Sequence, residues 1–119
     1  MVEKTLAVKD DAIDFAVDVY GLIKMLPQEE KYALGDQLRR ASVSIASNIA
    51  EGSARGSKKD FAHFLRQADG SLQEVKCQIT IAVKLGYIPR EEAAKVYKKA
   101  EDIGRQLGGL IKYLTVNNS

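Results

Sequence analysis

Four long stretches of the sequence place apolar residues three or four positions apart, which is the spacing of one face of a helix. The clearest row runs from Phe61 through Leu72 to Val83. No stretch alternates apolar and polar residues with the two-residue period of a strand. The pattern therefore predicts four amphipathic helices, at about residues 10–26, 29–51, 58–85 and 90–114.

Several residues set the expected ends of these helices. Asp10 suits a helix N-terminus, because an acidic side chain offsets the positive end of the helix dipole. Pro27 disfavours helical backbone in the residue before it, and Gly52 is a residue that commonly follows a helix. Ser57 and Asp60 have the spacing of a capping box. We therefore expect short turns between the helices.

Short connections between helices of similar length favour neighbours that run antiparallel. The 119 residues are enough for one domain with a proper core. We therefore predict an all-α fold, an antiparallel up-down-up-down four-helix bundle that forms a single domain over residues 1–119.

The composition excludes several functional classes. The formal net charge is only +2, far from that of a dedicated nucleic-acid binder. The chain has one histidine, His63, and one cysteine, Cys77, so a multi-histidine metal site, a cysteine cage and an intramolecular disulfide are excluded within one chain. We expect no enzymatic activity, no catalytic residue, no metal and no cofactor. No apolar run has the length of a signal peptide or membrane span, so we expect a soluble, cytoplasmic protein.

Three of the predicted helices carry apolar or small residues opposite the core row. A monomeric bundle needs one buried stripe on each helix, so a second stripe indicates contact with another chain. The alternative is that these residues are scattered and exposed without a role. We predict a homo-oligomer. The residues are Ile13, Val17, Tyr20, Val43, Ala46, Ala50, Gly70, Cys77 and Ile81.

A narrow polar stripe follows the second helix on an otherwise apolar or small-residue segment. Asn48 and Glu51 lie in it, and no nucleophile or base in the sequence is placed to work with them. We expect these two residues to cap the helix end or to bridge helices through buried hydrogen bonds. The stripe consists of Gln37, Arg40, Ser44, Asn48, Glu51 and Arg55.

Basic residues are concentrated between residues 31 and 66, where seven bases stand against three acids. Lys58 and Lys59 fall in the first turn of the third helix, where cations oppose the helix dipole. Either a bound anion such as a phosphate offsets this cost, or the two lysines are simply solvated. The candidate nucleic-acid-binding residues are Arg39, Arg40, Arg55, Lys58, Lys59 and Arg66.

Five segments resemble a known family, the four-helix bundle proteins encoded by intervening sequences of 23S rRNA. They are Gln37 to Gly52 (QLRRASVSIASNIAEG), Gly56 to Phe61 (GSKKDF), Phe64 to Leu65 (FL), Gly70 to Leu72 (GSL) and Leu85 to Ile88 (LGYI). The resemblance covers nearly the whole chain. Ala46 departs from it, because the family often carries proline there.

The resemblance implies an antiparallel four-helix bundle without an established catalytic activity. Family members are similar to the accessory variability determinant of diversity-generating retroelements, which implies a homopentamer that works with a reverse transcriptase and nucleic acid. We therefore predict a non-enzymatic homo-oligomer that binds nucleic acid, RNA in particular, weakly and without sequence specificity. The alternative is a protein–protein scaffold for a neighbouring enzyme, with no nucleic-acid binding.

Overall fold

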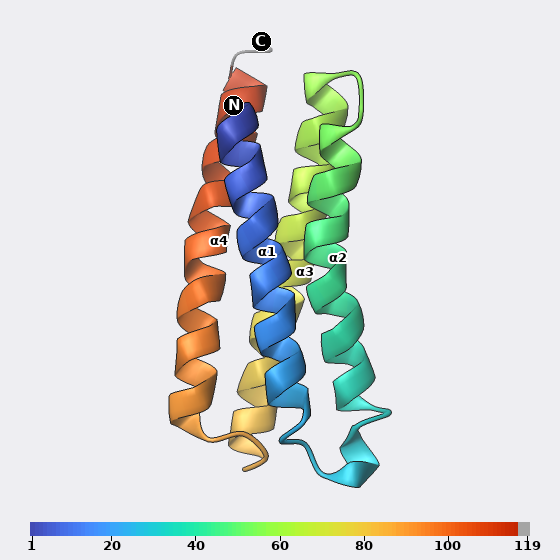
Figure 1. Ribbon diagram of the computed structural model, residues 1–119, viewed down its shortest axis with the longest axis vertical. Helices are drawn as coiled ribbons and strands as arrows, with labels where there is room; N and C mark the ends of the chain where they lie inside the picture. The colour runs from blue at the N-terminus through green and yellow to red at the C-terminus, as the bar shows by residue number, and fades with distance from the viewer. Residues whose placement is uncertain (117–119) are drawn as a thin grey trace.

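The computed structural model describes residues 1–116, and in that range it is all-α, with four long helices and no strand (Figure 1). Both described ends of the chain and the α2–α3 turn lie at the same end of the molecule (Figure 1). The predicted up-down-up-down order is confirmed. The helices are α1 (Val2–Ile23), α2 (Leu34–Ser53), α3 (Lys58–Lys84) and α4 (Arg90–Val116).

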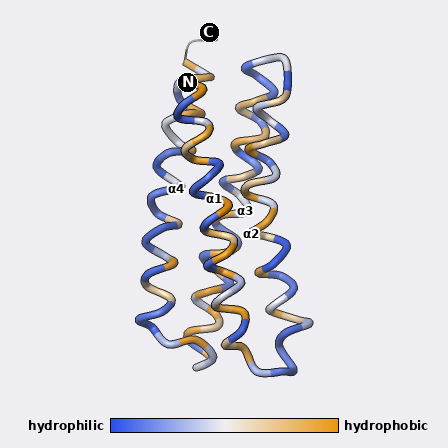
Figure 2. The backbone as a smooth tube through the Cα atoms, in the orientation of Figure 1, coloured by the Kyte–Doolittle hydropathy of each residue, from blue (hydrophilic) through white to orange (hydrophobic). Residues whose placement is uncertain are grey.

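Each helix packs against its two neighbours around the bundle: α1 and α3 both contact α2 and α4. The molecule is an elongated rod with extents of 48 × 24 × 20 Å. Every helix carries both apolar and hydrophilic residues along its whole length (Figure 2). The apolar rows form one core, in which Phe15, Leu38, Leu65 and Leu107 are fully buried.

The first helix begins at Val2, eight residues before the predicted start. Thr5 and Val8 are buried and continue the apolar row upstream of Asp10. The Thr5 hydroxyl also donates a hydrogen bond to the Met1 carbonyl at 3.0 Å. The prediction from the acidic residues was wrong because the buried row, rather than the charges, sets the length of the helix.

The connection between α1 and α2 also differs from the prediction. Helix α1 ends at Ile23, and a single 3₁₀ turn, η1 (Gln28–Glu30), occupies the start predicted for the second helix. Pro27 holds extended backbone before that turn, and α2 begins only at Leu34. The second helix therefore starts five residues later than predicted, because the chain must first turn back toward the core.

Gly52 lies inside α2, where α2 and α3 approach closely. A Cβ atom at this position would lie 2.7 Å from the Cβ of Phe64 and 3.0 Å from the Cδ1 of Phe61. Helix α2 continues to Ser53, so the role predicted for Gly52 as the end of the helix was wrong. The residue is small because a neighbouring helix occupies the space, and this contact draws the start of α3 against the end of α2.

The predicted N-cap of α3 is confirmed. The Ser57 hydroxyl accepts a hydrogen bond from the backbone N–H of Asp60 at 3.1 Å. At the other end of α3, Gly86 has a φ of +79°. Its N–H bonds to Val83, and the N–H of Tyr87 bonds to Ala82, which is the pattern of a Schellman motif. Both ends of α3 are therefore fixed by local hydrogen bonds.

Candidate nucleic-acid interface

The structure divides the six predicted nucleic-acid-binding residues between separate parts of the molecule. Arg39 and Arg40 lie in the first half of α2, and Arg55, Lys58 and Lys59 lie around the turn at its far end. From Arg40 to the end of α2 at Ser53 the helix rises about 20 Å. Arg66 lies about two turns into α3. One subunit therefore does not present the six as a single patch.

Arg39 has a local structural role. Its guanidinium donates a hydrogen bond to the Lys31 carbonyl at 2.8 Å and pairs with Asp36. These contacts hold the turn before α2 against the helix. Arg40, the next residue, is exposed and forms no ion pair with any residue of the described range 1–116.

We name the end of the rod that contains the α2–α3 turn the basic end. It holds Arg55, Lys58 and Lys59, together with Lys4 of α1 and Lys112 of α4. The acidic residues nearby are Glu3, Glu51 and Asp60. Five bases against three acids leave a local excess of +2, equal to the formal charge of the whole chain.

Aromatic rings lie beside two of these cations. The Arg55 guanidinium is 4.9 Å from the centroid of the Phe64 ring, and its Nε pairs with Glu51 at 3.2 Å. The Lys58 ammonium is 5.9 Å from the centroid of the Tyr113 ring. Cations over aromatic faces are electrostatically attracted to them. The contact of Lys58 with Tyr113 also links the start of α3 to the last turn of α4.

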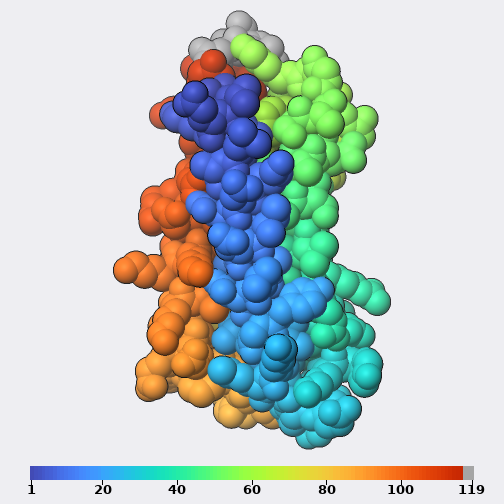
Figure 3. Space-filling model, in the orientation of Figure 1, coloured from blue at the N-terminus to red at the C-terminus, as the bar shows by residue number. Residues whose placement is uncertain are grey.

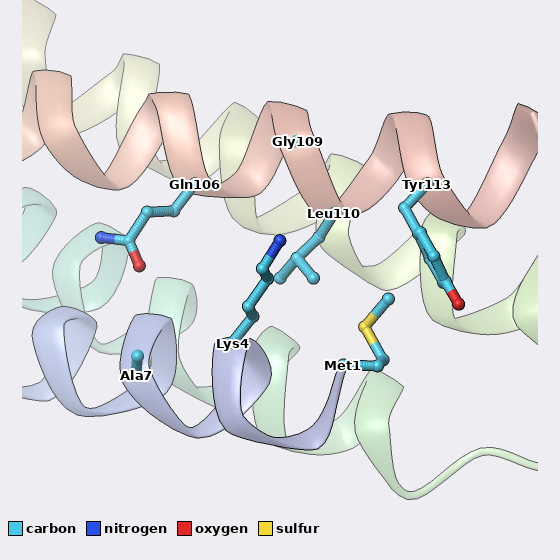
Figure 4. Close-up of a pocket in the computed structure, with 7 residues that line it drawn as sticks. All are labelled: Met1, Lys4, Ala7, Gln106, Gly109, Leu110 and Tyr113. Atoms are coloured by element: carbon cyan, nitrogen blue, oxygen red, sulfur yellow. The ribbon is translucent and has the colours of Figure 1, made fainter.

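A cleft of about 420 Å³ lies between the start of α1 and the end of α4 (Figure 4). Lys4 extends from α1 toward α4, so its ammonium stands within the cleft (Figure 4). Gly109 leaves the α4 side without a side chain, and Gln106 is held by Asp11 at 2.8 Å. The lining residues are Met1, Lys4, Ala7, Gln106, Gly109, Leu110 and Tyr113.

Sequence reasoning missed Lys4, Lys112 and Tyr113 as members of this surface. Lys4 and Lys58 lie more than fifty positions apart in the sequence, but in the structure Lys4 lines the same cleft as Tyr113, and Lys58 lies beside the Tyr113 ring. An up-down-up-down topology brings the start of α1, the end of α4 and the α2–α3 turn to one end. That topology was predicted, and it was the signal that could have located these residues.

The polar stripe of α2 bridges α2 to α3. The Ser44 and Ser71 hydroxyls lie 2.9 Å apart across the two helices. The Asn48 amide donates to the Ser44 carbonyl at 2.9 Å and to the Ser44 hydroxyl at 3.0 Å. Glu51 pairs with Arg55 one turn further on. The role predicted for Asn48 and Glu51 was therefore wrong, because both bond to residues of the same segment, and the bridge to α3 is made by Ser44.

The histidine and the cysteine lie apart on α3. His63 is exposed, with its Nε2 3.2 Å from the Gln67 amide, and Cys77 is also exposed. They are fourteen positions apart in the sequence, which corresponds to a rise of about 21 Å along the helix. Residues 1–116 contain no group of three His, Cys, Asp or Glu side chains that could hold a metal ion. None of the helices in that range is long and apolar enough to cross a membrane.

Most of the large apolar residues predicted to lie opposite the core are exposed in the single chain. Val17 is 67% exposed, and Ile13, Tyr20, Val43 and Ile81 are also exposed. Ala46 differs, because it is partly buried against the core. The bundle therefore leaves hydrophobic surface on its outer faces.

Comparison with known proteins identifies a family and a similar solved structure. A family model described as 23S rRNA-intervening sequence protein matches residues 4–109. A crystal structure of a protein with unknown function, from the S23 ribosomal protein family of Bacteroides thetaiotaomicron, is similar with a TM-score of 0.85 and 30% sequence identity. The similarity covers 92% of this chain and 98% of that chain. No curated protein matches the sequence.

Proposed function

The chain belongs to the 23S rRNA-intervening sequence protein family, and we propose that it is a non-enzymatic homo-oligomer that binds nucleic acid through its basic end. The binding is directed at phosphates and has no sequence specificity. RNA is the favoured ligand. By the resemblance to the accessory determinant of diversity-generating retroelements, the assembly has five subunits and works beside a reverse transcriptase.

The observation that carries the proposal is the position of Lys58 and Lys59. Both lie in the first turn of α3, are exposed, and form no ion pair with residues 1–116. Cations at a helix N-terminus are unfavourable by about 0.3–1 kcal/mol each. A phosphate at this end would offset that cost, and the helix N-terminus itself favours an anion.

Tyr113 adds a surface on which an unpaired base could stack. It is 48% exposed and lies between Lys58 and the cleft that holds Lys4. Stacking of a base on an aromatic side chain contributes about 1–3 kcal/mol and is insensitive to base identity. Unpaired segments of RNA are therefore the expected ligand at this end.

Self-association would multiply a weak basic patch. In a cyclic assembly every subunit presents its basic end on the same rim, so the excess of two positive charges on each subunit is repeated around it. Clustered charge raises the local field and the rate of encounter with a polyanion. The exposed Val17 and Val43 side chains support such an assembly, because they leave apolar surface for another subunit.

The test is binding of a fluorescent single-stranded RNA of about 20 nucleotides, titrated at about 50 and 200 mM salt. The variant Lys58→Glu/Lys59→Glu should bind at least ten-fold more weakly. Its salt dependence, as log K against log salt, should be shallower by about 1.4, the loss of two contacts at about 0.7 each. Arg40→Glu, at the other end of α2, is the matched control and should bind as the wild type does. Absence of binding at low salt, or equal binding by the double variant, would refute this function.

The second candidate is a protein–protein scaffold that does not bind nucleic acid. It is favoured by the pairing of Arg39 with Asp36 and of Arg55 with Glu51, which leaves fewer cations for phosphates. The same titration separates the two functions. The genes beside this one add a second criterion, because an adjacent reverse transcriptase favours the nucleic-acid function.

A further inference from the structure

A groove of about 580 Å³ follows the outer surface between the end of α3 and the start of α4. Its floor is apolar and includes Ile79, Val83, Ala93, Ala94 and Tyr97. Tyr97 is held from one side by the Lys76 ammonium, which lies 5.1 Å from its ring centroid. We call this surface the α3–α4 groove.

The rim of the α3–α4 groove is cationic. Lys84, Arg90 and Lys98 line it, and none of them forms an ion pair with residues 1–116. Glu101 also lines the groove, but its charge is already paired with Lys76 at 3.2 Å. An apolar floor with unpaired cations along its rim suits an amphipathic helix with acidic residues beside its apolar face.

Helix α1 of this chain carries such a face. It runs down the front of the molecule between α4 and α2 (Figure 3). Its exposed apolar residues include Leu6, Ile13, Val17 and Tyr20, which we call the α1 stripe.

Acidic residues border the α1 stripe. Asp10 is exposed, lies beside the stripe, and forms no ion pair within residues 1–116. Asp14, one helical turn further on, is also exposed, but it lines a cleft with Lys98 and Lys99 of the same subunit. Helix α1 as a whole carries five acids and two bases, a net charge of −3. Its outer face is therefore apolar along one line and negative along the next.

We infer that the α1 stripe of one subunit docks into the α3–α4 groove of the next. This rests on the self-association in the proposed function and names the two surfaces that meet. The pairing covers both apolar surfaces and brings Asp10 toward Lys84 and Arg90. Each subunit carries one copy of each surface, so the contact repeats from subunit to subunit and closes into a ring when the rotation allows.

Pairing of two α1 stripes about a two-fold axis is the main alternative arrangement. It would bring two helices with a net charge of −3 together and would leave the cations of the α3–α4 groove without partners. Like charges across an interface disfavour the pairing. The charges of this chain therefore favour the contact between unlike surfaces.

Two single-residue variants test the inference. Val17→Arg disables the α1 stripe and Ala94→Arg disables the groove, and both positions are exposed, so circular dichroism should show that both variants fold. Light scattering at micromolar concentration should give more than one subunit for the wild type and one subunit for each variant. An equimolar mixture should give two subunits, because the intact groove of one variant accepts the intact stripe of the other. Glu91→Arg, in α4 but outside the groove, should keep the wild-type mass.

The other outcomes are distinguishable. If Ala94→Arg keeps the wild-type mass, the groove receives some other partner and the inference is overturned. A mixture that stays at one subunit overturns the pairing of unlike surfaces. A wild type with the mass of one subunit overturns the self-association in the proposed function, and the inference fails with it.

Discussion

Helices α2 and α3 meet through small side chains, whereas α1 and α4 meet along their outer edge through charged and amide side chains. Between α2 and α3, Gly52 leaves room for Phe64 and the Ser44 hydroxyl meets that of Ser71. Between α1 and α4, Lys99 pairs with Asp18, and the Gln106 amide donates to Asp11. The two helix pairs share one core, but small side chains make the contact in the first pair and polar side chains make it at the outer edge of the second.

This difference predicts that substitutions at the two contacts change the stability of the protein by different amounts. A close steric fit is destabilised by a single added methyl group, because the interior has no space to absorb it. An exposed polar contact contributes little, because water competes for both partners. We therefore expect substitutions between α2 and α3 to have larger effects than substitutions at the edge between α1 and α4.

The largest effect is expected from Gly52→Ala. The new Cβ would lie 2.7 Å from the Cβ of Phe64, so α3 must shift, and we expect a loss of about 1–3 kcal/mol in the free energy of unfolding. Gly109→Ala, in α4 beside the cleft, is the matched control, because no atom lies within 4 Å of the added Cβ. It should stabilise the protein by about 0.5–1 kcal/mol. Urea unfolding at one protein concentration measures both. Equal effects would remove the contrast between the two helix pairs.

Ser44→Ala should have the next largest effect. It leaves the buried Ser71 hydroxyl without its partner across the helices, which costs about 1–2 kcal/mol. Ser71→Ala should cost only about 0.5 kcal/mol, because the Ser44 hydroxyl keeps its hydrogen bond from Asn48. Urea unfolding of the two single variants and the double variant measures both losses of stability and the coupling between the two hydroxyls. If Ser71→Ala loses as much stability as Ser44→Ala, the hydrogen bond from Asn48 does not compensate the Ser44 hydroxyl for its lost partner.

The smallest effect is expected at the contact of Lys99 with Asp18. The hydrogen bond and the charge of Asp18 raise the pKa of Lys99 above its ordinary value of 10.5. A raised folded-state pKa contributes stability that is fully present below pH 10.5 and is lost as pH rises through the folded value. Both side chains are substantially exposed, so we expect less than about 1 kcal/mol.

Lys99→Met tests this contribution when its stability difference from the wild type is measured at about pH 9 and again above pH 11. The difference should shrink at the higher pH. Asp18→Asn should lower the stability by the same amount as Lys99→Met at the lower pH. The variant that combines both substitutions should be no less stable than either one alone. A difference that does not change with pH would contradict the assignment.

The sequence was sufficient for the fold, because apolar spacing reports directly on which face of a helix is buried. It was less informative about the helix ends in the first third of the chain. Thr5 and Val8 extend α1 upstream of Asp10, and a 3₁₀ turn replaces the predicted start at Glu29. Ends depend on where the chain must turn to reach the core, which a local pattern does not encode.

The candidate site was predicted only in part, for a related reason. Lys58 and Lys59 were recognised because they are adjacent and precede a helix. Lys4 and Tyr113 join them only once α1 and α4 are placed beside each other. The role of Gly52 was likewise hidden, because it depends on the proximity of Phe64 across two helices.

The order of contacts around the bundle has a consequence for how the chain folds. Helix α1 packs on α2, α2 on α3, and α3 on α4, so three of the four helix pairs join segments that are consecutive in the chain. Only the α1–α4 pair closes a long loop, which makes it the entropically expensive step of assembly. We therefore expect the α2–α3 hairpin to form early and α1 to meet α4 last. The contact between α1 and α4 should also open first in the native protein. The backbone amide hydrogens of these two helices should therefore exchange with solvent before those of α2 and α3.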